Sequence, residues 1–587
     1  MLIKTMKKNM GFLPKKLKKF SKQHSLVKAA LASSAALTFA GCGGGDSNNG
    51  GAPGAGLTQS GILNPIADVS IKEGGLITLT PTATSPTGRS LTFSYSGFMT
   101  SNTKQTAIGD AGVYSVTVSV NDGVASDSLN VKVIVYSGNI TRQAEHLVRR
   151  ITFGMTPTLY NEVDALGAQG FLDQQLDPSS IDDTAFTRRI AGATVNTRTE
   201  LRALMLRHMI FSKRQLLEVM TWFWDNHFNT DINSLRGSQE RLDAQNNFEL
   251  SENNGIRAEA LGNFRNLLGA SAKSPTMVLY LNSAQNRKRD SNENYARELL
   301  ELHTMGVNGG YTDLDVEAGA EIFTGWHLTN LVFTFAPDQH NTDPQTYLGN
   351  NIPTGGLEQG EQVLDILSRH TATAQFICSK LVTLFVNDTP PASLVSRCAS
   401  TFQSAAGDPD QISQVLRIIL TSVEFNDSVN NLAKVKTPVE FVTSVARGLE
   451  GESDGSRLTS HVSSIGMRIY ENALPTGWSE KGADWMSSGL LLERLKVVEN
   501  MLRVNTSSNL QTDLLTYFRS NGATTSDTIV DFMIQRLLGE TPTAALKQPL
   551  VTFLDGANGF NLTDNDAVRR LRQTLELVMS YPQFQYQ

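Results

Sequence analysis

Two things are scarce in this chain: cysteine and long apolar runs. Three of its 587 residues are cysteine, so a fold held together by many disulfides is excluded. After the opening segment, no apolar run reaches the length that a membrane-spanning helix requires. The His-Glu-x-x-His, Gly-x-Ser-x-Gly and phosphate-loop patterns are missing too, so the sequence does not support the enzyme classes that those patterns mark.

The opening segment lacks acidic residues. Nine lysines precede a short apolar run, residues 29–41, which ends at Cys42. A basic region, an apolar region and then small residues is the order of a secretion signal. Leu37-Thr-Phe-Ala-Gly-Cys42 resembles a bacterial lipobox, so we predict a signal peptide at residues 1–41 and lipidation of Cys42. The alternative is an ordinary signal peptide cut nearby, with Cys42 incidental.

The predicted location follows from this segment. Gly43 rather than Asp follows Cys42, which favours the outer membrane of a two-membrane cell envelope, facing the periplasm or the surface. The Gly-rich residues 42–61 are then a flexible linker between the lipid and the body of the protein. Losing nine lysines moves the formal net charge from -6 to about -15. Nucleic acid is therefore not an expected partner, because phosphate binding needs a basic surface.

Residues 62–137 alternate apolar and polar side chains in short runs separated by glycine-containing turns, which predicts a β-sandwich. Residues 110–123 resemble the last hairpin of cadherin-like and polycystic-kidney-disease-type immunoglobulin-fold modules. Such modules often bind calcium at an Asp-rich turn, but here Ser85 and Arg89 stand where carboxylates are needed. We therefore expect an immunoglobulin-like spacer without calcium at this turn. Adhesion or glycan contact is the alternative.

From about residue 142 to residue 587 the apolar period becomes helical. The expected fold is thus multidomain: an N-terminal all-β sandwich followed by a large, mainly α-helical domain. One small β-hairpin is expected inside the helical domain. Its strands are Val332-Phe-Thr-Phe and Gln345-Thr-Tyr-Leu, on either side of a polar tip at residues 337–344.

Four residues of the helical domain are candidates for chemistry. His227 ends an apolar helical face with Leu216, Met220 and Phe223, where burial would shift its pKa. It is either a metal ligand or general base, or a core histidine with one hydrogen bond. Glu298 follows a capping-box-like start at residues 290–293.

A buried Glu298 would have to bind metal or be clamped by an arginine. Glu293, Arg297 and Glu301 beside it have the spacing of a solvated salt-bridge ladder. His303 lies on the side of the same helix that carries Leu299 and Leu300. His340 lies at the hairpin tip, which is either a binding loop or simply a turn.

The two remaining cysteines are Cys378 and Cys398. They lie in helix-like segments, residues 372–386 and 393–405, and are symmetric about the turn that joins them. In an oxidising compartment they could form a disulfide if the side chains face each other. Two buried free thiols are the equal alternative.

Several segments together resemble the bacterial family known as domain of unknown function 1800, from about residue 142 to the C-terminus. The resemblance implies an exported helical protein with no assigned activity, whose relatives often accompany an exported protein of sulfatase-like fold. The usual tip pattern of His-Asp followed by Gly and Lys is His340-Asn341 here, with Gln345 replacing the lysine. The segments are His146-Leu-Val-Arg-Arg-Ile-Thr-Phe-Gly-Met-Thr-Pro, Leu166-Gly-Ala-Gln-Gly-Phe-Leu-Asp-Gln-Gln-Leu, Trp224-Asp-Asn-His-Phe, Ala260-Leu-Gly-Asn-Phe-Arg-Asn-Leu-Leu, Asn292-Glu-Asn-Tyr-Ala-Arg-Glu-Leu-Leu-Glu-Leu-His-Thr-Met-Gly, Phe323-Thr-Gly-Trp, Lys436-Thr-Pro-Val-Glu-Phe-Val and Leu474-Pro-Thr-Gly-Trp.

Two functions are compatible with these features. The first is a membrane-anchored binding or assembly factor that docks a co-exported partner, such as the sulfatase-like-fold protein, or an envelope component. The second is a hydrolase-like enzyme assisted by a divalent metal, with a site near His227, Glu298 and His340. A metal site needs at least three such ligands converging around a position open to water. Geometry therefore decides between the two.

Overall fold

The computed structural model describes residues 63–587 except 87, 139 and 234–238, and for residues 239–243 it describes the backbone alone. The predicted signal peptide, Cys42 and the whole Gly-rich linker lie outside the described residues. All described residues belong to one compact unit, Gly61–Gln587.

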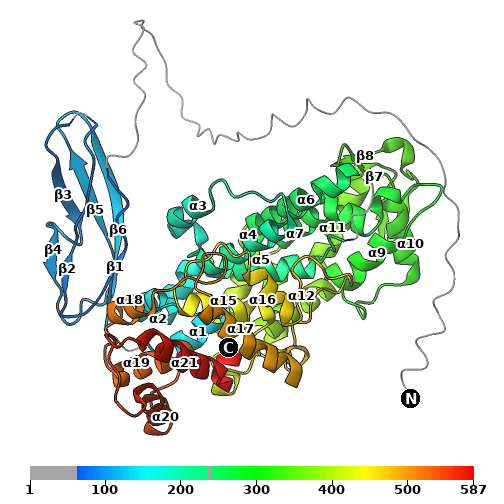
Figure 1. Ribbon diagram of the computed structural model, residues 1–587. Coiled ribbons are helices and arrows are strands. Elements are labelled where there is room, and N and C mark those ends of the chain that lie inside the picture. The colour runs from blue at the N-terminus through cyan, green and yellow to red at the C-terminus, as the bar shows by residue number, and fades with distance from the viewer. Residues whose placement is uncertain (1–62, 87, 139, 234–238) are drawn as a thin grey trace, which may run out of the picture. The chain divides into compact units, whose positions relative to one another are not determined.

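The first described elements are strands that share an apolar core of their own (Figure 1). A four-stranded sheet has the order β1-β6-β5-β3, with β1 parallel to β6 and the other pairs antiparallel, and β2 pairs with β4 separately. All six strands lie within residues 62–137, the segment whose alternating pattern predicts strands. The strands are β1 (Val69–Lys72), β2 (Leu76–Thr78), β3 (Thr92–Gly97), β4 (Thr103–Gln105), β5 (Gly112–Asn121) and β6 (Ser126–Tyr136).

From Arg142 onward the chain is mainly helical, as its apolar period predicts (Figure 1). The helices bury their apolar faces in one continuous core. They are α1 (Arg142–Ile151), α2 (Pro157–Leu176), α3 (Thr184–Ile190), α4 (Arg198–Phe211), α5 (Gln215–His227), α6 (Gln239–Glu259), α7 (Phe264–Ala272), α8 (Pro275–Tyr280), α9 (Asn294–Glu298), α10 (Asp313–Ile322), α11 (Leu357–Arg369), α12 (Thr371–Phe385), α13 (Ala392–Ser404), α14 (Gln411–Leu420), α15 (Pro438–Gly448), α16 (Leu458–Ser464), α17 (Ser488–Arg503), α18 (Leu514–Ser520), α19 (Ser526–Met533), α20 (Ala544–Asp555), α21 (Ala567–Ser580) and α22 (Pro582–Gln585).

The predicted pairing of the small hairpin is wrong. Strand β8 (Val332–Phe335) pairs with β7 (Trp326–Thr329), and β9 (Gln345–Tyr347) pairs with β10 (Asn350–Ile352), so two hairpins replace one. Asn330 and Leu331 form the two-residue turn between β7 and β8, and Leu348 and Gly349 form the one between β9 and β10. All four residues have positive φ. Two central residues with positive φ match the twist of a two-residue hairpin.

Local capping explains where several helices begin. Thr312 and Asp315 form the predicted capping box at the start of α10. The capping box predicted before α9 is wrong: Glu293 makes no side-chain cap there. Its carboxylate instead accepts a bond from Arg297 at 2.9 Å. Arg297 also approaches Glu301, at 3.8 Å, so the predicted salt-bridge ladder is present.

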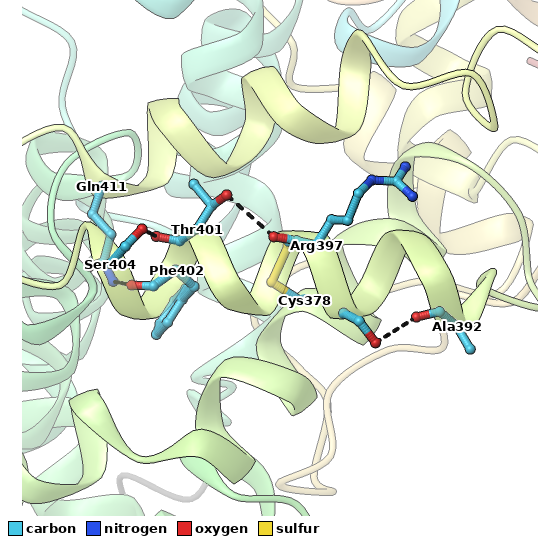
Figure 2. Close-up of a disulfide and its surroundings, with 9 residues drawn as sticks. Cys378, Ala392, Arg397, Thr401, Phe402, Ser404 and Gln411 are labelled. Atoms are coloured by element: carbon cyan, nitrogen blue, oxygen red, sulfur yellow. Dashed lines mark hydrogen bonds between the residues drawn. A yellow bond between two sulfur atoms is a disulfide. The ribbon is translucent and has the colours of Figure 1, made fainter.

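A disulfide joins the helical hairpin formed by α12 and α13. Cys378 and Cys398 are bonded across 20 residues of chain, and both side chains are fully buried. Figure 2 shows the disulfide together with neighbouring residues of α13. Among these is Phe402, whose carbonyl accepts a 2.7 Å hydrogen bond from the Gln411 side chain. The bond fastens two neighbouring helices at their shared interface.

Within residues 63–587, gaps excepted, no helix combines the length and the apolar content that a bilayer span requires.

Candidate functional site

His227 and His303 meet in the core. His227 Nε2 lies 3.0 Å from the backbone oxygen of His303, and the two ring centroids are 6.3 Å apart. The Nδ1 atom of His227 and the Nε2 atom of His303 are buried without a hydrogen-bond partner. Burial, together with the charge of Lys380, lowers the pKa of both rings, that of His303 to about 3. Both rings are therefore neutral at physiological pH.

His303 sits on a distorted part of its helix. The α-helical geometry of α9 gives way to the π-helical turn η3 (Leu299–Thr304). The wider turn frees the carbonyl of Leu299 to accept a 2.6 Å bond from the Thr304 hydroxyl. The residue whose carbonyl contacts His227 therefore lies within a π-helical turn.

The other two candidates lie elsewhere. Both ring nitrogens of His340 are engaged, Nδ1 at 2.8 Å from Thr324 O and Nε2 at 2.8 Å from Gln359 Oε1. Glu298 is half-buried, and burial and the charge of Glu301 raise its pKa. Within the described part of the chain, no three or more His, Cys, Asp or Glu side chains are arranged to hold a metal ion. The structure therefore does not bring the predicted ligands into one group.

Asn341, the residue that departs from the expected His-Asp tip, has a specific partner. Its side-chain amide donates a 2.9 Å hydrogen bond to Glu321 Oε2. An aspartate at this position would face that carboxylate with a second negative charge. The side-chain amide of Asn341 is therefore compatible with the neighbouring Glu321 carboxylate, whereas an aspartate would be repelled by it.

A group of buried carboxyls lies on the other side of α5, and sequence reasoning missed it. We call Asp225, Glu249 and Glu252 the carboxyl interior. The hydroxyl of Thr230 lies 3.4 Å from Glu249 Oε1 and 3.3 Å from Glu252 Oε2. The side-chain amide of Asn253 donates to Asp225 Oδ1 at 3.2 Å.

The carboxyl interior holds protons. Glu249 is 2% exposed and Glu252 8% exposed, and Glu252 Oε1 has no hydrogen-bond partner. A hydroxyl has one proton to donate, so Thr230 cannot satisfy both glutamates. Burial raises the pKa of Asp225 to about 6. Burial together with neighbouring carboxylates raises the pKa of Glu252 to about 8 and that of Glu249 strongly. At neutral pH Glu249 and Glu252 are thus largely protonated, whereas Asp225 is largely ionised.

A second buried group has the opposite sign. Arg150, Lys436, Arg447 and Arg494, which we call the cation interior, are each at most 6% exposed. Among the described residues none of the four has an acidic partner within ion-pair distance. Buried cations are rarely left unpaired. Burial lowers the pKa of Arg150 and Arg447 to about 9 and of Arg494 to about 10.

The three arginines of this group bind backbone carbonyls. Arg150 donates to Asn430 O at 2.5 Å, and Arg494 donates to Lys436 O at 2.5 Å. Arg447 donates to Gly154 O at 2.7 Å and to Ile210 O at 2.6 Å. Their guanidinium groups therefore fasten loops to helices that are distant in sequence.

A pocket opens beside Arg447. Its volume is about 270 Å³, and we call it the α15 pocket. Its apolar wall includes Leu159, Ile181, Ile210 and Phe211. Glu450, also in its wall, has a positive φ of 45° and accepts hydrogen bonds from the amide and hydroxyl of Thr158 at 3.2 and 2.8 Å.

The carboxylates around the α15 pocket are already engaged. Besides Glu450, Glu162 pairs with Lys132 and Glu452 pairs with Arg189. Lys213 at the rim pairs with Asp68 at 2.6 Å. Of the charged groups in the pocket wall, Arg447 and Glu450 have no ion-pair partner among the described residues, and the charge of Glu450 acts on Arg447.

Segments far apart in sequence meet around these groups. Gly154, which follows α1, approaches α15 so closely that a Cβ atom would lie 2.8 Å from Ser444 Cα. Asn226 exchanges two hydrogen bonds with the backbone of Trp478, at 2.9 and 2.6 Å. The two contacts involve three of the segments on which the family resemblance rests, and Ser444 lies two residues after a fourth.

These features define a mainly helical protein with two groups of buried ionisable side chains, one acidic and one basic, and a pocket beside the basic group. Residues 146–586 match the family described as "Protein of unknown function (DUF1800)", and the chain belongs to this family. Neither a curated protein nor a solved structure matches the chain.

Proposed function

We propose that this protein is an exported, lipid-anchored binding or assembly factor of the bacterial cell envelope. In this proposal Cys42 carries the lipid, residues 62–137 form an immunoglobulin-like spacer, and residues 142–587 bind the ligand or partner. The shared core of strands β1 to β6 supports the spacer. A co-exported protein of sulfatase-like fold remains the proposed partner.

The α15 pocket is the observation that carries the binding function. An apolar wall with one unpaired buried guanidinium suits a molecule with an apolar body and one anionic group. We therefore propose a medium-chain carboxylate or a lipid fragment of that chemistry as the ligand class. A volume of about 270 Å³ is near the lower end for small-molecule sites, which favours a short chain.

Calorimetric titration of the purified protein tests this pocket without any substitution. Octanoate carries the charge and octanol does not, while their apolar chains are similar. We expect octanoate to bind at least tenfold more tightly than octanol, because only octanoate neutralises Arg447. Equal affinity, or no binding of either, would refute the proposed ligand class.

Variants sharpen the test. Arg447→Lys keeps the charge but loses the fork that binds two carbonyls, so octanoate should still bind more tightly than octanol. Arg447→Met should abolish the difference between the two ligands. Arg503→Met, at an exposed arginine of α17, is the matched control and should leave both affinities unchanged.

Anchoring needs a separate measurement in the native host. We expect radiolabelled palmitate to enter the wild-type protein, and Cys42→Ser to lose both the label and the membrane fraction. Label retained by Cys42→Ser would contradict lipidation at this position.

A further inference from the structure

A small cavity on the other side of α15 is lined by three cationic side chains. Arg149 of α1, Lys436 just before α15, and Arg536 of the π-helical turn η7 (Ile534–Leu538) line it, together with Ser444 and Phe584. Its volume is about 20 Å³, and no acidic side chain lines it. We call it the Lys436 cavity.

Lys436 differs from the arginines of the cation interior. It is 5% exposed, and its ammonium group donates to the Ser444 hydroxyl at 3.3 Å rather than to a backbone carbonyl. Its Nζ atom also lies 4.2 Å from the centroid of the Phe584 ring. An ammonium group has three protons to donate, so its hydrogen-bonding capacity is largely unused.

The other two cations of the cavity differ in their pairing. Arg149 is bound to Glu145, with 3.2 Å between Nη2 and Oε1. Arg536 has no acidic partner among the described residues, and its Nε and Nη1 atoms are buried without hydrogen-bond partners. Its guanidinium carbon lies 3.1 Å from the centroid of the Tyr160 ring, and its Nη2 atom donates to Asn161 Oδ1 at 3.4 Å. Buried donors without acceptors cost free energy in the absence of a further partner.

We infer that the Lys436 cavity binds one small inorganic anion, of the size and charge of a halide ion. A volume of about 20 Å³ exceeds what a single water needs and is too small for an organic anion. Water could accept some of the hydrogen bonds, but it would not neutralise Lys436 and Arg536. A monatomic anion supplies both the acceptor and the negative charge.

The electrostatics of Lys436 agree with this assignment. Burial, together with the charges of Arg149 and Arg494, lowers its pKa well below the usual value, and Glu440 opposes this shift. An anion in the cavity would favour the charged ammonium, so occupancy and protonation of Lys436 would be linked.

Thermal unfolding of the purified full-length protein tests the proposal. A ligand that binds only the folded state raises the melting temperature as its concentration rises. At constant ionic strength, we expect replacement of sodium gluconate by sodium chloride or bromide to raise the melting temperature and then to saturate. Gluconate is too large for the cavity and serves as the ionic control.

Two variants identify the site. Lys436→Met should abolish the saturable rise, whereas Lys496→Met, at a lysine whose side chain is 57% exposed, should retain it. Equal melting temperatures in halide and gluconate for the wild-type protein would overturn the proposal. So would the same halide response in Lys436→Met and in the wild type.

Crystals of the wild-type protein grown in bromide give a readout that needs no variant to fold. We expect an anomalous peak within about 3.5 Å of Lys436 Nζ, at hydrogen-bonding distance. A water without anomalous signal there, or bromide at surface positions only, would overturn the assignment.

Discussion

The carboxyl interior and the cation interior deal with buried charge in different ways. Around Thr230, Glu249 and Glu252 face each other across one hydroxyl, so protons remain on the carboxyl groups. Around α15, the guanidinium groups of Arg447 and Arg494 keep their charge and donate to backbone carbonyls. A carboxyl can shed its charge by holding a proton near neutral pH, whereas an arginine cannot lose its proton there. The first region should therefore respond to pH and the second to the loss of its carbonyl partners.

The largest expected effect is the removal of a guanidinium group from the cation interior. Arg494→Met keeps the apolar length of the side chain but leaves the carbonyl of Lys436 without its donor. We expect a loss of about 3 kcal/mol in the free energy of unfolding, measured by urea denaturation. Arg503→Met, at an exposed position on the same helix, should change it by less than about 0.5 kcal/mol. A loss below about 1 kcal/mol for Arg494→Met would contradict the structural role of these bonds.

The second effect has the opposite sign and depends on pH. Glu252 has a pKa of about 8 in the folded protein, above the usual value of 4.5. Between these two pH values the folded protein keeps a proton that the unfolded chain loses. Stability is therefore lost as pH rises from about 4.5 to 8. Glu252→Gln removes this loss and should stabilise the protein by about 2 kcal/mol at pH 8, with no gain at pH 4.

The matched control for this variant is Glu499→Gln, at a glutamate whose side chain is 53% exposed. It should leave the pH dependence of the free energy of unfolding unchanged. Parallel pH curves for Glu252→Gln and the wild type would contradict the protonated state of the carboxyl interior.

The smallest effect concerns the histidines on the opposite side of α5 from Asp225. His303 has a folded pKa of about 3, below the usual 6.5, so the unfolded chain binds a proton that the folded chain rejects. Stability is full above pH 6.5 and is lost as pH falls towards 3. His303→Leu should therefore be more stable than the wild type by about 1–2 kcal/mol at pH 5.

The same variant supplies its own control at pH 8, where the wild-type imidazole is neutral in both states. Any difference there measures packing alone, since Phe228 and His227 surround the ring. If the difference between variant and wild type is the same at both pH values, His303 is not held neutral by burial.

The sequence predicts the helices better than the interiors. Apolar spacing locates α5, and the Thr312 capping box locates the start of α10, because both signals are local. The hairpin pairing failed because Asn330-Leu331 and Leu348-Gly349 are turns with weak sequence signals, whereas the proline-rich tip has a strong one. The prediction therefore placed the hairpin turn at the proline-rich tip, where the turn signal is strongest, and missed the two real turns.

The candidate site was only partly predictable. His227 and His303 are found by their place on apolar helix faces, but His340 proves to belong to a separate polar network. Glu249 and Glu252 look like ordinary surface residues of a polar helix, and only the shortage of apolar residues on α6 marks its buried face as unusual. The partners of Arg447 are backbone carbonyls of the distant Gly154 loop and of the last turn of α4, which no side-chain pattern in the sequence can reveal.

The buried bond between α12 and α13 constrains how the protein matures. Exchange of a disulfide requires an incoming thiolate to reach one of its sulfur atoms. Cys378 and Cys398 are fully enclosed, so an oxidoreductase gains access only while the helical hairpin is still open. The chain must therefore meet its oxidant before these helices close, and a chain that closes first would keep two thiols that later oxidants cannot reach.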